Sequence, residues 1–396
     1  MEKLASPYFK GEIIVISSAP IKAYFAEAGY GQNHAAAWFG VIWFTLLVWM
    51  IAQVIVGIPM IIGITVVDPD WMSKMPSGSL ENSGSPLPVM GYLLSTLTAL
   101  ILYFARDNIG NAKERTVLSL AVISAVISMI CLGFMLKEND AEANAFLLGY
   151  IGKSPLVYFA MLLVFPLVSI GLFIGQRVIH KRSIRSLLTA SAKFRWNRML
   201  FSMGVFWAIA GSLSFFMHQS GQNEAEYVFD ASRFWPYFIV SLLFIPLQSA
   251  TEEIVLRGYL NQGLSRFIQS PWIIFIITSA GFAALHLGNP EIAQGAEEGT
   301  KWLTLSAYFF FGFFACILTY IDGGLETAIG VHAANNLFAA VMMGYDHSAL
   351  PTPTVFKVGF NSGLDSILTI AGLSLVCLIM YLTRARSLDS LKAIDI

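Results

Sequence analysis

The stretch 249-SATEEIVLRGYLNQ-262 decides how this chain is interpreted, because it joins an apolar run to a group of charges. The preceding residues 235–247 are strongly apolar and are typical of a membrane helix. Glu252 and Glu253 then stand side by side, and Arg257 follows one turn later. A charged side chain at the centre of a bilayer costs a few kcal/mol, so such residues are usually paired or functional. The stretch therefore predicts a membrane helix that carries a polar site.

The composition supports the membrane assignment for the whole chain. Its 396 residues are 56% hydrophobic and 12% charged, whereas soluble domains carry about 25% charged residues. Several separate apolar runs predict an all-α, polytopic transmembrane helical bundle in the lipid bilayer. The net charge of −1 argues against a nucleic-acid partner. Cys131, Cys316 and Cys377 lie in apolar runs without paired spacing, which favours core packing over disulfides or a metal motif.

We predict ten membrane spans with both termini in the cytoplasm. The spans are 37–66, 89–105, 116–136, 155–175, 199–217, 235–256, 271–287, 302–321, 325–344 and 363–383. The first span holds Gly57 and Pro59, which predicts a kink or a tilt. Residues 1–20 do not have the pattern of a cleaved signal peptide, so we expect the first span to serve as the insertion signal.

Loop charges agree with this topology. The connector 177-RVIHKRSIRSLLTASAKFRWNR-198 has eight Lys, Arg or His residues and no acid, which indicates the cytoplasmic side. The predicted sides of the other loops then alternate: 106–115, 257–270 and the C-terminal tail are inside, and the acidic loops 67–88, 218–234 and 288–301 are outside.

The chain divides around this basic connector. The predicted parts are an N-terminal cytoplasmic arm (1–36), four accessory spans (37–176), the connector (177–198), a catalytic helical core (199–345), and the last span with its tail (346–396). Spans one to four carry almost no ionisable residue, so we expect the chemistry in the second half.

Helical phase separates the two glutamates. Residues four apart share a face of a helix, whereas neighbours diverge by about 100°. Glu253 and Arg257 are therefore placed for an ion pair, while the corresponding neighbour of Glu252 is Leu256. This predicts one structural acid and one free acid. The alternative, at about even odds from this stretch alone, is a buried ion network that only joins two helices.

Two further clusters lie in later spans, 282-FAALH-286 and 332-HAANN-336. The same spacing pairs Phe282 with His286, and His332 with Asn336. The other four histidines (His34, His180, His218 and His347) fall in loops or flanks, whereas His286 and His332 are expected well within spans. A lone helical histidine is more often a core residue. Two of them near a free carboxylate favour a functional site.

The positions of these residues along their helices predict that they can meet. With a turn near Gln269, Glu252 lies 17 residues before it and His286 lies 17 after it. His332 lies about eight residues into its span, roughly 12 Å from the inner face. The hairpin of spans six and seven must then project about 12 Å into the cytoplasm for the three residues to share a layer. We expect the site in the cytoplasmic half of the membrane, open to that side.

A carboxylate, two imidazoles and a carboxamide suit hydrolysis. Glu252 would be the general base that takes a proton from water, and His286 would hold or polarise that water. His332 and Asn336 would stabilise the oxyanion of a tetrahedral intermediate, and losing one such donor costs about 3 kcal/mol of barrier.

A zinc site is the competing mechanism. Glu252, His286 and His332 match the ligand types of a catalytic zinc with an open position. However, the usual HExxH signature is absent, and Asn336 is a poor zinc ligand. We therefore favour hydrolysis without a metal or other cofactor, with zinc as the alternative.

The three clusters in this order resemble the CPBP family of CAAX proteases and bacteriocin-processing intramembrane endopeptidases, also called the Abi family. The resemblance rests on EExxxR (Glu252, Glu253, Arg257), FxxxH (Phe282, His286) and HxxxN (His332, Asn336), and it covers roughly residues 199–345. It implies a membrane peptidase with a helical-bundle core. It also implies that Glu252 activates water with help from His286, and that His332 and Asn336 form the oxyanion site.

The local sequences 252-EEIVLRGYL-260 and 284-ALHLGNP-290 are similar to those of bacterial members. We therefore expect a multi-pass protein of a bacterial inner (plasma) membrane that cleaves peptides or membrane proteins rather than prenylated proteins. The rival from another class is a proton-coupled secondary transporter, which ten spans and buried ionisable residues would fit. It predicts inverted repeats with broken helices in both halves. The sequence has no such repeat, and its polar residues gather in one half.

Overall fold

The computed structural model describes residues 19–75, 91, 94–98, 123–124, 127 and 146–384. Its α-helices are α1 (Ala19–Ala26), α2 (Ala35–Val67), α3 (Trp71–Lys74), α7 (Pro155–Val178), α8 (Arg185–Leu188), α9 (Trp196–Gln219), α10 (Ala231–Glu253), α11 (Asn261–Leu264), α12 (Pro271–Leu285), α13 (Pro290–Glu297), α14 (Lys301–Asp322), α15 (Glu326–Leu337) and α16 (Ser362–Leu382). A 3₁₀ turn, η1 (Glu27–Gly29), and two π-helical segments, η3 (Ile254–Leu260) and η4 (Phe338–Met342), interrupt or extend them.

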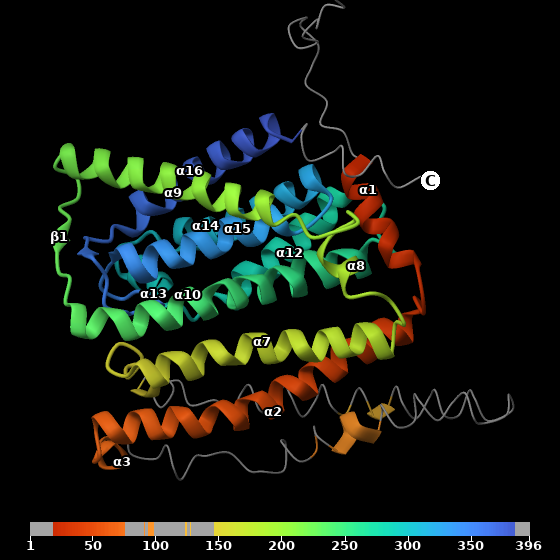
Figure 1. Cartoon of the computed structure of the whole chain (residues 1–396), viewed down its shortest axis with the longest axis horizontal. Coiled ribbons are helices and arrows are strands. Elements are labelled where there is room, and N and C mark those ends of the chain that lie inside the picture. Colours follow the sequence, from red (N-terminus) through yellow and green to blue (C-terminus); the bar gives the residue numbers. More distant parts are fainter. Residues whose placement is uncertain are drawn as a thin grey trace, which may run out of the picture.

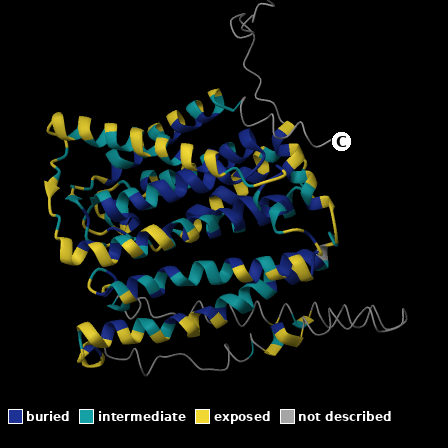
Figure 2. Ribbon diagram, viewed as in Figure 1, coloured by how far each residue is buried: buried dark blue, intermediate teal, exposed yellow. Residues whose placement is uncertain are grey.

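The long helices lie side by side with α15 inside the bundle (Figure 1). Neighbouring helices pack in the series α2, α7, α10, α15 and α9. α14 contacts α12, α15 and α16. Ten of the 12 residues of α15 are buried. Figure 2 shows the buried residues gathered on the middle helices, with more exposed residues along α2 and α9.

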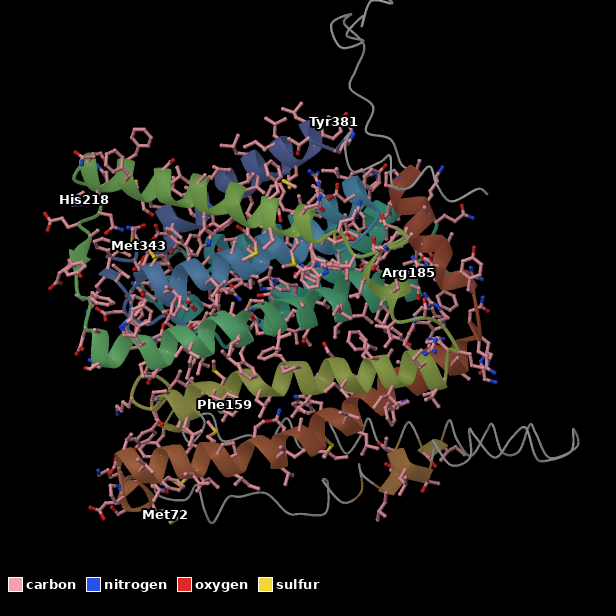
Figure 3. The ribbon with its side chains drawn as sticks, viewed as in Figure 1. Met72, Phe159, Arg185, His218, Met343 and Tyr381 are labelled. Atoms are coloured by element: carbon pink, nitrogen blue, oxygen red, sulfur yellow. The ribbon has the colours of Figure 1, made fainter. Side chains whose placement is uncertain are left out.

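The two ends of the bundle differ in structure. One end carries α1 and α8, with Arg185 among its side chains, and the other carries β1, with His218 nearby (Figures 1 and 3). At the second end, β1 (Glu226–Tyr227) pairs antiparallel with β3 (Phe356–Lys357), and β2 (Met343–Gly344) pairs parallel with β3. This small sheet ties the loop before α10 to the loop before α16.

Capping residues explain where several helices begin. Ser154 accepts from the backbone N–H of Val157 at the start of α7, and Asp230 and Asn361 cap α10 and α16 in the same way. α7, α12 and α13 each have proline in their first turn, where no backbone donor is needed. α14 ends at Gly323, which has a φ of 63° in the left-handed region that favours glycine.

The protein is a multi-pass membrane protein. Within the described ranges, six helices are long and apolar enough to cross a membrane: α2, α7, α9, the continuous helix Ala231–Leu264, α14 and α16. α12 and α13 would make a seventh span only as a pair bent by 85°. The predicted spans 89–105 and 116–136 lie largely outside the described residues. The count of ten spans and the cytoplasmic location of both termini therefore stay predictions.

The predicted spans 271–287 and 325–344 differ from the structure in an informative way. α12 stops at Leu285, and α15 with η4 covers only 326–342 inside the bundle. An apolar helix of this length is as typical of a buried core as of a membrane span, and hydropathy does not separate the two environments. α15 is thus an internal helix that other helices surround.

The predicted polar loop 257–270 is mostly helical. The helix that holds the glutamates continues through η3 and α11 to Leu264, and Gln262 is fully buried. Gln262 donates to the Ser186 carbonyl oxygen at 2.7 Å and accepts from Arg182 at 2.7 Å. The connector that holds both partners therefore packs against this end of the helix. The remaining turn, 265–270, agrees with the turn predicted near Gln269.

His180 gives this end of the bundle a predicted sensitivity to acid. Its ring is fully buried, with Nδ1 at 2.6 Å from the Gln32 carbonyl oxygen and Nε2 at 2.9 Å from the Tyr259 hydroxyl. The pKa of His180 is lowered to about 4, mainly because the ring is buried; the hydrogen bond to the Gln32 carbonyl oxygen opposes this shift and the nearby Arg182 charge adds to it. Because the folded pKa lies below the ordinary value of 6.5, neutral His180 stabilises the fold above pH 6.5.

We expect this contribution to be lost as the pH falls from 6.5 towards 4. The measurement is the thermal unfolding temperature in detergent against pH for wild type and His180→Gln. Wild type should lose stability more steeply over this window. Parallel curves for the two proteins would contradict the prediction.

Candidate active site

A buried ion pair forms the base of the site. Arg257 Nη1 lies 3.3 Å from Glu253 Oε1, and both side chains are fully buried. The Arg257 guanidinium also lies over the Phe282 ring, 4.6 Å from its centroid. The ion pair predicted from the four-residue spacing is therefore present, and α12 covers it with an aromatic ring.

Gly312 on α14 makes room for this guanidinium. A Cβ at this position would lie 2.9 Å from Arg257 Nη2, 3.2 Å from the Ser279 Cα and 3.3 Å from the Phe282 Cβ. α12 and the Arg257 guanidinium therefore leave no room for a side chain at position 312.

We predict that Gly312→Ala destabilises the protein by about 1–3 kcal/mol, because overpacking a filled core has this cost. The measurement is unfolding in detergent. Gly204→Ala is the matched control, since a Cβ at Gly204, on the membrane helix α9, has no neighbour within 4 Å among the described residues. Equal stability of the two variants would contradict the role of Gly312.

Glu253 has a second partner. His332 Nδ1, from α15, lies 2.8 Å from Glu253 Oε1. An ionised carboxylate only accepts hydrogen bonds, so the proton lies on Nδ1. The ring is held by an edge contact with Phe311 at 5.0 Å between centroids. The prediction that Glu253 serves Arg257 alone was incomplete, because spacing within one helix cannot show a partner 79 residues away.

Glu252 has a different environment from its neighbour. Its side chain is 19% exposed, and His332 Nε2 lies 3.7 Å from its Oε2. Its Oε1 accepts from Gln248 Nε2 at 2.5 Å. The Oε2 atom is buried and has no hydrogen-bond partner within the described part of the chain. Glu253 Oε2 likewise has no hydrogen-bond partner, so Glu252 differs from Glu253 in its partial exposure and in having no arginine partner among the described residues. Helical phase separates the two acids with respect to Arg257, but both carboxylates contact His332.

Asn336 joins Glu252 through a residue that sequence analysis missed. Asn336 Nδ2 donates to Gln248 Oε1 at 2.9 Å, and Asn335 Nδ2 donates to Asn336 Oδ1 at 2.9 Å. Gln248 thus bridges Asn336 and Glu252. The four-residue spacing that pairs Gln248 with Glu252 was visible in the sequence. A neutral glutamine does not stand out from a membrane helix in the way that a charged residue does.

His286 lies at the break between α12 and α13 rather than within a continuous helix. It is the C-cap residue, and the chain bends by 85° into α13 directly after it. Its Nδ1 lies 2.7 Å from the Phe282 carbonyl oxygen, so Nδ1 carries a proton and Nε2 is the acceptor of the neutral ring. The ring lies between Phe282 and Tyr308, with centroids at 4.3 and 4.7 Å. It also interacts electrostatically with Glu252.

The positions of Glu252 and His332 along their helices can be compared with the predicted hairpin, whose projection into the cytoplasm stays a prediction. Glu252 is 12 residues before the helix end at Leu264, and His332 is six residues after the first residue of α15. The six-residue difference corresponds to about 9 Å of extra helix. The predicted value was about 12 Å. The projecting end packs against α1, α8 and η1 instead of extending freely.

Both π-helical segments are next to the site. η3 begins directly after Glu253, and η4 begins directly after Leu337. π-Helical turns widen a helix locally and occur frequently at functional sites. Here they place the ends of α10 and α15 so that Glu252, Glu253 and His332 meet between the two helices.

The donor set does not fit a preassembled zinc site. Among the residues that the structure describes, no group of three or more His, Cys, Asp or Glu side chains is arranged to hold a metal ion. Glu252, His286 and His332, the ligands of the zinc alternative, are therefore not gathered around one point. We derive no step through a metal.

The fold and site define a helical, multi-pass membrane protein with carboxylate, imidazole and carboxamide groups enclosed by its helices. Residues 231–338 match the family model for Type II CAAX prenyl endopeptidase Rce1-like proteins. Residues 231–338 are therefore an Rce1-like (CPBP/Abi) family domain, which holds all four predicted site residues and lies within the predicted core.

One curated relative is an uncharacterized protein, YyaK, of Bacillus subtilis (strain 168). It is 31% identical over 193 residues, which are 48% of this chain and 62% of the relative. The match thus leaves more than a third of the relative uncovered. No solved structure matches the chain.

Proposed function

We propose that this protein is an intramembrane endopeptidase that hydrolyses peptide bonds with a water molecule activated by Glu252. The observation that carries the proposal is the contrast between two adjacent carboxylates. Each carboxylate has an Oε2 atom without a hydrogen bond, but Glu253 is fully buried and pairs through Oε1 with Arg257 and His332. Glu252 is 19% exposed beside the same histidine and has no Arg or Lys partner among the described residues. Family membership is consistent with a peptidase.

In this mechanism Glu252 Oε2 takes a proton from water while the water oxygen attacks the peptide carbonyl carbon. Glu252 then delivers the proton to the amide nitrogen as the C–N bond breaks. His286 assists by accepting the second water hydrogen at Nε2, since its Nδ1 proton is held by Phe282. The water is thereby oriented by two acceptors on different helices.

The tetrahedral intermediate places negative charge on the former carbonyl oxygen. His332 Nε2 and Asn336 Nδ2 are the proposed donors to this oxyanion. Donation by Nε2 requires a doubly protonated ring, because Nδ1 already donates to Glu253. In the substrate-free structure Asn336 Nδ2 donates to Gln248, so Gln248 holds the amide until substrate takes its place. Glu253 then has two roles, since it neutralises Arg257 and orients His332.

The proposed substrates are peptides or membrane proteins. The site lies among membrane helices, and the proposed opening is on the cytoplasmic side of a bacterial plasma membrane, in line with the predicted topology and with the motifs that resemble bacterial members. We do not propose prenylated proteins as substrates, although the family's name refers to them, because the family match covers only residues 231–338 of this chain.

The test is a cleavage assay with purified wild-type protein in detergent or vesicles and a pool of membrane peptides, with products read by mass spectrometry. We expect defined cleavage products, and the same products after a chelator treatment that removes bound zinc. An intact peptide pool would contradict the peptidase proposal. Loss of cleavage with chelator and recovery with zinc would contradict the metal-free mechanism.

A further inference from the structure

A second buried carboxylate, Glu291, lies next to the site but outside the proposed chemistry. It is on α13, directly after the bend that follows His286, and it is 5% exposed. Its Oε1 accepts from the Tyr345 hydroxyl at 2.9 Å and from the Ala349 backbone N–H at 2.9 Å. The Tyr308 hydroxyl donates to its Oε2 at 3.4 Å. Glu291 therefore joins α13, α14 and the loop after β2.

Tyr308 connects this carboxylate to His286. Its ring stacks on the His286 ring with 4.7 Å between centroids and 25° between planes. Its hydroxyl accepts from Asn289 Nδ2 at 3.1 Å, and the Asn289 backbone N–H donates to the His286 carbonyl oxygen at 3.0 Å. The phenol ring is thus fixed from two sides by residues of the bend.

His286 needs such support because of where it lies. As the C-cap residue of α12 it has no following turn of the α-helix, and the next helix, α13, lies at 85° to α12. One hydrogen bond, from Nδ1 to Phe282, sets its distance from the helix but leaves the ring free to rotate about that bond. The contacts of the imidazole with the Phe282 and Tyr308 rings restrict this freedom.

We propose that Tyr308 and Glu291 are positioning residues for His286: Tyr308 fixes the imidazole plane by stacking, and Glu291 anchors Tyr308 to the bend. This inference rests on the proposed function for its catalytic consequence, because His286 is the group that orients water. The Glu291 carboxylate has only neutral hydrogen-bond partners and forms no ion pair among the described residues.

The kinetic series separates stacking from hydrogen bonding. Tyr308→Leu removes the ring, and we expect kcat to fall by about tenfold to a hundredfold with KM within about twofold, since small misplacements at a reacting centre have such effects. Tyr308→Phe keeps the ring and should retain most of kcat. Glu291→Ala should lie between them. Tyr158→Phe is the control, because it removes another buried hydroxyl contact, to Ser241, which joins α7 to α10 and involves none of α12, α13 and α14.

A second readout does not depend on activity. In protein labelled with ¹³C at the histidine ring, the His286 resonance is identified by its absence in His286→Gln. Stacking between two aromatic rings shifts this resonance upfield, so Tyr308→Leu should move it downfield, Glu291→Ala should do so in part, and Tyr308→Phe and Tyr158→Phe should leave it in place.

An unmoved His286 resonance in folded Tyr308→Leu or Glu291→Ala overturns the positioning role. If Tyr308→Leu does not fold, Glu291→Ala carries the same test. A protein that shows these shifts but cleaves no peptide contradicts the proposed function and leaves the positioning of His286 supported. A loss of kcat in Tyr308→Phe equal to that in Tyr308→Leu would overturn the stacking explanation.

Discussion

Replacing Glu252 by glutamine is expected to lower kcat by about a thousandfold, within the range that general-base catalysis supplies. The amide is nearly isosteric with the carboxylate but cannot take a proton from water. The bond from Gln248 to the Oε1 position can persist, and no buried cation loses its partner. Folded yield and unfolding temperature in detergent should therefore equal those of wild type.

The neighbouring acid provides the matched control for this prediction. Glu253→Gln changes the same chemical group one residue away, but there it removes the charge that balances Arg257 and orients His332. We expect a lower folded yield and a lower unfolding temperature in this variant. If Glu252→Gln and Glu253→Gln had the same profile of yield and activity, the assignment of separate roles would be wrong.

Removing Arg257 is expected to cause the largest loss of stability, about 3–5 kcal/mol for Arg257→Met, because one partner of a buried ion pair is left uncompensated. Both side chains are fully buried, so water cannot replace the guanidinium without opening the helix contacts. Unfolding by denaturant in a fixed detergent measures this loss.

The double variant Glu253→Gln with Arg257→Met tests whether the cost comes from the unpaired charge. Removing both charges should recover part of the stability lost in Arg257→Met, because no isolated ion remains buried. His332 loses its carboxylate partner in this variant, so activity should stay low even where stability returns. A double variant less stable than either single variant would contradict this account of the pair.

The local part of the site was predictable from the sequence. The Glu253–Arg257 pair, and the absence of Glu252 from it, depend on residues within two turns of one helix, where the periodicity of the α-helix fixes relative positions. The turn near Gln269 could be placed because Ser270 and Pro271 begin the next helix. These features need no knowledge of the tertiary structure.

The remaining features depend on contacts between distant helices. The bond from His332 to Glu253 and the bridge by Gln248 to Asn336 join α10 to α15, and no spacing within one segment reveals them. The position of α15 inside the bundle was missed for a related reason. Hydropathy measures how apolar a helix is, and it does not distinguish a lipid environment from a protein interior. The bend after His286 is set by the packing of α13 on α14, which is likewise tertiary.

The most direct measurement follows the oxygen of the attacking water. A susceptible membrane peptide is incubated with the enzyme in oxygen-18-labelled water, and the new carboxyl terminus is analysed by mass spectrometry. We predict that wild type inserts the label at each cleaved bond and that folded Glu252→Gln yields almost no labelled product. Labelled product at the wild-type rate with Glu252→Gln would contradict the claim that Glu252 activates the water.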